Sequence, residues 1–79
     1  MVMSGVKTAQ GYITVVQEDR FRLMTDGGQG FLLTLARDAR TSAADLCHLH
    51  DIHAHVAITY SGEPNLASGI AHAIRALDQ

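Results

Sequence analysis

The sequence lacks most of the features that cross-link or rigidify small proteins. Its 79 residues include one cysteine, one proline and no tryptophan. Because Cys47 is the only cysteine, no disulfide can form within the chain, and stability has to come from packing. A domain of this length buries only about 60% of the surface that its unfolded chain exposes. We therefore expect a stability of a few kcal/mol, which self-association would increase.

Long apolar runs and a strong excess of either charge are also missing. The longest apolar stretches, residues 30–33 and 56–58, are far shorter than the about 20 residues that a membrane-spanning helix needs. Six Lys and Arg against eight Asp and Glu give a formal charge of −2, which argues against a polyanion-binding tail. The first seven residues have no apolar run of the length that a secretory signal needs. We expect a soluble, cytoplasmic protein that does not enter a membrane.

Three segments have the composition of β-strands. Residues 11–17 are rich in β-branched and aromatic side chains, whereas residues 20–25 and 31–35 alternate apolar with polar or small ones. Between the last two segments, Asp26-Gly27-Gly28-Gln29 supplies the positive φ angles of a tight hairpin turn. The alternation places Phe21, Leu23, Phe31, Leu33 and Leu35 on the core side. We predict three meandering strands that follow a flexible lead-in over residues 1–9.

A short helix is predicted over residues 43–50. Ser42 can cap its N-terminus, and Asp45 stands three residues later, where the carboxylate of a capping box lies. The apolar side chains that would face inward from this helix are Leu46, Leu49 and Ile52.

The rest of the chain adds two strands. Residues 54–60 alternate, with Val56, Ile58 and Tyr60 on the apolar side, and a loop follows at 61–65. Residues 67–77 fit either a helix or a strand; we favour a strand, because the preceding pattern needs a strand that closes the sheet. Residues 10–77 would then form a single domain.

This order of elements resembles the OB-fold, a five-stranded barrel with one helix. The landmarks are the long first strand, the glycine hairpin, Leu46 and Leu49 on a plugging helix, and a fourth strand that ends at Gly62. The resemblance implies a mainly β fold, an OB-like barrel in the order β-β-β-α-β-β. It also implies that the face of strands two and three binds single-stranded nucleic acid or oligosaccharides. On this face the chain has Arg20, Arg22 and Thr34.

The composition fits a protein partner better than nucleic acid. Single-stranded nucleic acid needs a basic groove with aromatic side chains on which bases stack. The chain has only two Phe and two Tyr, and Glu18, Asp19 and Asp26 flank the two arginines. We therefore expect a small binding module whose partner is a protein or a second copy of the chain. A single-stranded nucleic-acid-binding domain is the alternative.

Histidines form the remaining cluster. Four of the five lie within residues 48–55. Cys47 and His50 are about one helical turn apart, and His53 and His55 would share one face of a strand. Cys47, His50, His53 and His55 are thus candidate zinc ligands, and a weak metal-responsive binder is a third hypothesis. Only Asp51 and Ile52 separate the Cys47–His50 pair from the His53–His55 pair, which is a short link for the ligands of one tetrahedral site. Exposed histidines on a polar face are also commoner than zinc sites.

A catalytic site is not expected. A hydrolytic pair of Cys47 and a histidine, oriented by Asp51, would need a cleft and an oxyanion hole, and a small barrel offers little of either. Residues 27–30 are rich in glycine, but they join two strands instead of opening a helix, so they do not form a phosphate cradle. We predict a non-enzymatic protein without a cofactor.

Overall fold

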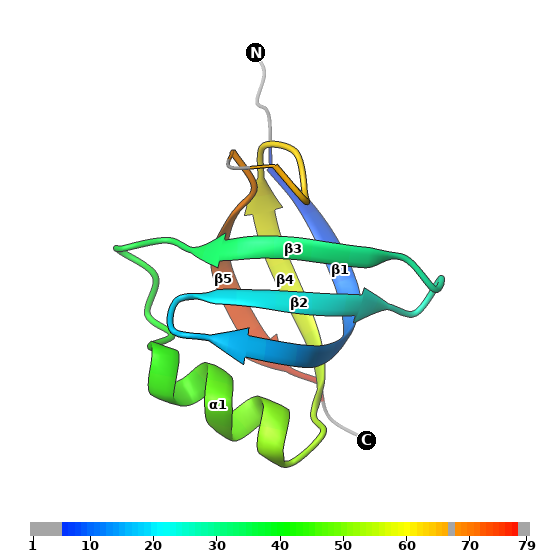
Figure 1. Ribbon diagram of the computed structural model, residues 1–79, viewed down its shortest axis with the longest axis vertical. Helices are drawn as coiled ribbons and strands as arrows, with labels where there is room; N and C mark the ends of the chain where they lie inside the picture. Colours follow the sequence, from blue (N-terminus) through cyan, green and yellow to red (C-terminus); the bar gives the residue numbers. More distant parts are fainter. Residues whose placement is uncertain (1–5, 67, 78–79) are drawn as a thin grey trace.

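The computed structural model describes residues 6–66 and 68–77, which form five strands and one helix (Figure 1). In chain order these are β1 (Val6–Gln17), β2 (Arg20–Thr25), β3 (Gly30–Leu35), α1 (Ala43–Asp51), β4 (His55–Ser61) and β5 (Ile70–Ala76). The predicted order of elements is confirmed, and the segment that fitted either a helix or a strand is the strand β5. No helix in the described part of the chain is long and apolar enough to span a membrane.

The strands form one mixed sheet that closes into a ring in the order β1-β2-β3-β5-β4. Neighbouring strands are antiparallel except β3 and β5, which pair in parallel at Thr34–Ile70 and Leu35–Ala71. β1 completes the ring because it is long enough to pair with two strands. Its first half lies against β4 and its second half against β2.

The start of β1 differs from the prediction. Residues 6–9, expected in a flexible lead-in, belong to the sheet and pair with Ser61, Tyr60, Thr59 and Ile58 of β4. Residues 1–5 of that lead-in lie outside the described residues. The local pattern of residues 6–9 has no clear period, and their strand conformation is stabilised by a partner about 50 positions away in the sequence.

Gly11 lies where β1 passes from one neighbour to the other. Its backbone pairs with Thr25 of β2 and with Val56 of β4. A Cβ atom at this position would overlap the carbonyl oxygen of Met24 and would lie 2.8 Å from the Cα of Thr25. The close approach of β1 and β2 at this point therefore requires glycine.

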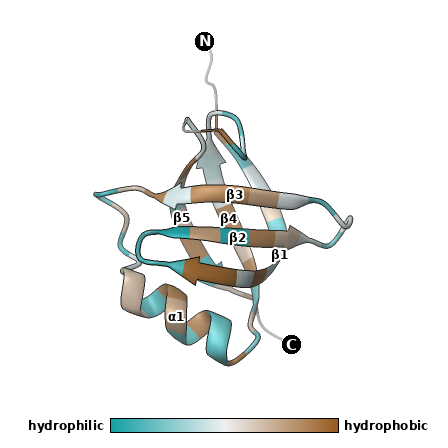
Figure 2. Cartoon of the chain, in the orientation of Figure 1, coloured by the Kyte–Doolittle hydropathy of each residue, from teal (hydrophilic) through white to brown (hydrophobic). Residues whose placement is uncertain are grey.

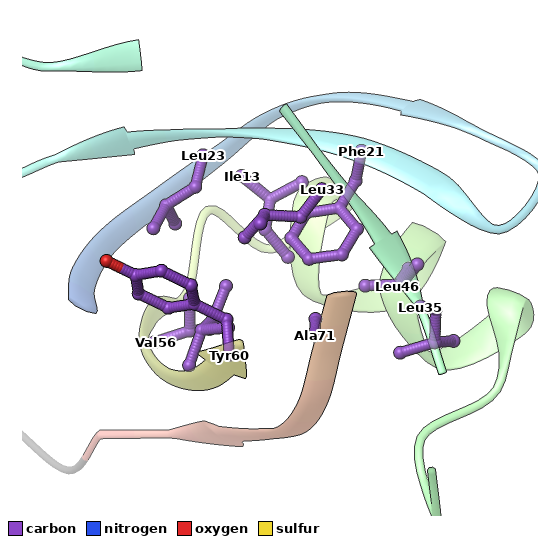
Figure 3. Packing of buried hydrophobic residues seen from close by; sticks show 10 residues of the cluster. Ile13, Phe21, Leu23, Leu33, Leu35, Leu46, Val56, Tyr60 and Ala71 are labelled. Atoms are coloured by element: carbon purple, nitrogen blue, oxygen red, sulfur yellow. The ribbon is translucent and has the colours of Figure 1, made fainter. Parts of the chain in front are cut away.

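The hydrophobic core lies inside the ring (Figure 3). The alternation along each strand supplies it, as predicted, and Phe31 packs partly buried against it. The buried side chains are Ile13, Phe21, Leu23, Leu33, Leu35, Leu46, Val56, Ile58, Tyr60 and Ala71. Leu46 belongs to α1, which lies across one end of the ring in Figure 1 and places this fully buried side chain in the core.

The N-terminus of α1 has the predicted capping box. The Asp45 backbone N–H donates to the Ser42 hydroxyl at 3.2 Å, and the Ser42 backbone N–H donates to the Asp45 carboxylate at 3.0 Å. The hydrogen bond from the Ser42 backbone N–H, and after it the interaction with the Ser42 side chain, lower the pKa of the Asp45 carboxyl below its ordinary value. The prediction for Ile52 was wrong: the helix ends at Asp51, and Ile52 is the C-cap and is 54% exposed.

Candidate binding face

The outer surface of β1, β2 and β3 carries the predicted binding residues. Because Phe21 and Leu23 point into the core, Arg20 and Arg22 point outward. The strand register aligns side chains on this surface into three rows, which are Tyr12–Met24–Gly30, Val15–Arg22–Leu32 and Gln17–Arg20–Thr34. We call the surface made by these three rows the outer face. It is turned toward the viewer in Figure 1.

A shallow hollow lies at the centre of the outer face. Its volume is about 250 Å³, and it is lined by Val15, Gln17, Arg20, Phe21, Arg22 and Leu32. Val15 is 53% exposed, and Met24 in the next row is 40% exposed. Figure 2 shows the same contrast, with hydrophobic colour at the end of β1 and along β3 beside hydrophilic parts of β2. The face thus combines exposed apolar side chains with two guanidinium groups.

An irregularity in β1 is what exposes Val15. The register with β2 shifts between Ile13 and Val15, so that Thr14 has no opposite residue and its hydroxyl donates to the Arg22 carbonyl at 3.4 Å. A regular strand would turn Val15 to the same side as Ile13. The extra residue instead turns Val15 outward and packs Val16 against the core. Sequence alternation alone therefore misses Val15 as a surface residue.

Both guanidinium groups of the outer face are without partners in the described part of the chain. The ion pair in residues 6–66 and 68–77 joins His55 to Asp26, and no acidic side chain there lies within 4.0 Å of Arg20 or Arg22. In the described part of the chain, the carboxylates of the β1–β2 turn, which flank the arginines in sequence, form no ion pair with them. Two fixed positive charges are thus available to an external anion.

The free edge of β3 beside this face is closed by the loop between β4 and β5. Asn65, in a turn with a left-handed φ of 74°, lies beside this edge of β3. Leu32 N–H donates to the Asn65 side-chain oxygen at 2.8 Å, and Asn65 N–H donates to the Leu32 carbonyl at 2.9 Å. The Asn65 side-chain amide donates to the Gly30 carbonyl at 3.1 Å. A partner therefore cannot pair with this part of β3 and has to engage side chains of the outer face.

The candidate zinc ligands are not brought together. Cys47 is exposed on α1, His50 is half-buried near the end of the helix, and His53 is exposed in the following turn with a φ of 54°. The expectation that His53 and His55 share a strand face was wrong, because β4 begins only at His55. Among residues 6–66 and 68–77, no three His, Cys, Asp or Glu side chains are placed to hold a metal ion.

His55 has a different set of contacts. Its Nε2 atom donates to the Asp26 carboxylate, at 2.9 and 3.0 Å from the two oxygens. Its ring stacks on Tyr12, with the ring centroids 5.0 Å apart. His55 therefore connects the start of β4 to the β2–β3 hairpin. This contact joins positions 29 residues apart, and no local motif indicates it.

The outer face presents few kinds of functional group. Its side chains are apolar, amide, hydroxyl or guanidinium groups, none of which is a general base at neutral pH. Arginine, methionine and tyrosine are enriched at the centres of protein interfaces.

Comparison of the chain with protein-family models, with curated proteins and with solved structures finds no match. A proposal for the function therefore has to be based on the geometry of the face.

Proposed function

We propose that the protein is a non-enzymatic binding module that docks a segment of a protein partner on the outer face. The observation that carries this proposal is the pair of guanidinium groups, Arg20 and Arg22, beside exposed Val15 and Met24. The two arginines lie on β2, the middle strand of the face, with apolar Val15 of β1 and Leu32 of β3 on either side of Arg22. This arrangement is complementary to an extended segment that alternates apolar and acidic residues. The partner is either another protein or a second copy of this chain, which itself has an excess of acidic residues.

The proposed fold of the module is an OB-type barrel. The closure of the ring through β1, the parallel pairing of β3 with β5 and the position of α1 between β3 and β4 support it. In OB-folds the face of the second and third strands is a common ligand surface. The outer face has the same position.

Single-stranded nucleic acid is the second candidate, because Arg20 and Arg22 could equally contact two phosphates. Stacking platforms are scarce for this function: Phe21 and Tyr60 are buried, Phe31 is half-buried, and Tyr12, 47% exposed, already stacks on His55. Two phosphate contacts also predict a small salt dependence, with a slope of about −1.4 in a plot of log K against log salt.

The test compares the two candidates on one protein. A peptide that alternates glutamate with valine and an oligothymidylate of about ten nucleotides are titrated separately, and backbone amide shifts are followed by NMR. Self-association is measured by sedimentation. We expect the peptide or a second copy to shift Val15, Met24 and Leu32. The double variant Arg20→Glu/Arg22→Glu should weaken that binding about tenfold, since each exposed ion pair contributes about 0.2 to 1 kcal/mol.

The control is Arg75→Glu, which makes the same kind of charge reversal on β5. Arg75 is exposed and lines a different surface hollow. It should leave binding unchanged. Binding of the oligonucleotide alone would replace the proposal with the second candidate. No binding of the peptide and no self-association, or equal effects of the two charge reversals, would contradict a docking role for the outer face.

A further inference from the structure

The end of the ring away from α1 holds a second, larger hollow. Its volume is about 480 Å³, and its walls come from the first half of β1, the β2–β3 hairpin, β3 and β4. Figure 3 shows Leu46, from α1, and Tyr60 on opposite sides of the core cluster. The end with Leu46 is filled by apolar side chains, whereas the end with Tyr60 is lined mainly by polar ones.

Tyr60 supplies a polar group at the floor of this hollow. The residue is only 7% exposed, and its ring meets Phe31 edge to face, with the centroids 5.7 Å apart. Within residues 6–66 and 68–77, its hydroxyl has no hydrogen-bond partner, although every fully buried side-chain N or O atom there has one. The hydroxyl therefore opens into the hollow. The Tyr60 ring is thus nearly buried, while its hydroxyl can donate a hydrogen bond to a ligand in the hollow or accept one from it.

Asp26 supplies the charge at the rim, and contacts with Gln10 and His55 fix its position. Its backbone N–H donates to the Gln10 carbonyl at 2.9 Å, which ties the hairpin to β1. Its carboxylate accepts from His55 Nε2, and the His55 ring is in turn held by stacking on Tyr12. A single N–H leaves each carboxylate oxygen with lone pairs for a further donor. The carboxylate is thus oriented before a ligand arrives.

The composition of the lining selects the charge of the ligand. Among the described residues that line it, Asp26 is the one charged residue, and neither lysine nor arginine contributes. The other polar side chains, among them Thr8, Gln10 and Gln29, are neutral groups that both donate and accept hydrogen bonds. We propose that this hollow binds a small organic cation whose ammonium group donates to the Asp26 carboxylate, while the Tyr60 hydroxyl hydrogen-bonds a second polar group of the ligand.

Three four-carbon probes test the ligand class, because they differ mainly in charge. 1,4-Diaminobutane is the cation, 1,4-butanediol the neutral analogue and succinate the anion. Each is titrated into the full chain at low salt, with backbone amide shifts as the readout. We expect only the diamine to shift Thr8, Gln10, Gln29 and Tyr60. Equal binding of the diol or of succinate would overturn the assignment to a cation, and the absence of shifts with all three would overturn the site.

Three substitutions test the residues. Asp26→Asn should weaken diamine binding about twofold to fivefold, since it removes an ion pair to a half-exposed carboxylate. Tyr60→Phe keeps the ring and removes only the hydroxyl, so we expect a loss of about fivefold. His55→Phe keeps a ring beside Tyr12 and removes the N–H that orients the carboxylate, so diamine binding should weaken, and tighter binding would contradict the orienting role of His55. The same spectra show whether each variant keeps its fold. Unchanged affinity in folded Asp26→Asn or Tyr60→Phe would overturn the proposal.

Discussion

Replacing Gly11 with alanine tests whether one residue allows β1 to serve two neighbouring strands. The added Cβ would overlap the backbone of Met24, which cannot rotate away as a side-chain end could. Overpacking of this kind costs about 1 to 3 kcal/mol. Moving β1 away from β2 would also weaken ladder hydrogen bonds of about 1 kcal/mol each. Alanine also restricts the conformations of the unfolded chain, which stabilises the folded state by at most about 1 kcal/mol. We therefore expect Gly11→Ala to lower the free energy of unfolding by about 2 to 4 kcal/mol, most of the stability of a domain this small.

The matched control is Gly30→Ala in β3, where an added Cβ would meet no heavy atom within 4 Å. The free energy of unfolding of Gly30→Ala should be unchanged or higher by up to about 1 kcal/mol, because alanine restricts the conformations of the unfolded chain. Urea unfolding followed by circular dichroism gives both values, with similar slopes if the two variants keep the native fold. If the two substitutions lower stability equally, or if Gly11→Ala is as stable as the native chain, the close approach of β1 and β2 does not require glycine.

Three further predictions concern the core and the helix. Leu33→Asp and Val56→Asp should each unfold the protein, because these side chains are 1% and 0% exposed, whereas Thr59→Asp should keep a dispersed amide spectrum; equal tolerance would refute the assignment of faces. Ser42→Ala should lower the free energy of unfolding by about 1 kcal/mol, measured in urea, and no change would show that the cap is not needed. Because the folded state lowers the pKa of Asp45, its stabilising effect is present above the ordinary aspartate pKa and is lost as pH falls through the folded value. The protection factors of the α1 amides, which correct for the intrinsic pH dependence of exchange, should therefore fall in acid in the native chain and less so in Asp45→Asn, and identical profiles would refute the linkage.

The features predicted correctly from the sequence depend on short stretches of chain. The alternation over β2 and β3, the Asp26-Gly27-Gly28 turn and the capping box of α1 each depend on residues within about six positions of one another. Side-chain period and turn chemistry act on that scale, so a single sequence is enough. The same alternation placed Arg20 and Arg22 on one outward surface, where the structure has them. Their role in binding stays a prediction.

The features that the sequence did not indicate depend on distant partners or on single backbone irregularities. The first residues of β1 are stabilised by β4, and Asp26 is oriented by His55 from 29 positions away. The positive φ of His53 turned that residue out of the expected strand. The hollow beside Tyr60 was missed for a related reason, because alternation assigns the ring to the core and says nothing of its hydroxyl. Period and propensity describe neighbours along the chain, whereas these features depend on the ring being closed.

The irregularity at Thr14 connects the stability of the domain with its proposed role. Without it, Val15 would face the same side as Ile13, and burying a valine side chain fully is worth about 1.5 to 3 kcal/mol. Turning Val16 inward recovers part of that burial, yet Val15 stays 53% exposed at the wall of the outer hollow. For a small domain, whose expected stability is a few kcal/mol, an exposed valine beside two arginines that have no ion-pair partner among the described residues is a local departure from the pattern that stability alone would favour. Such departures concentrate where a surface has to meet something else, which supports the docking role proposed for this face of the ring.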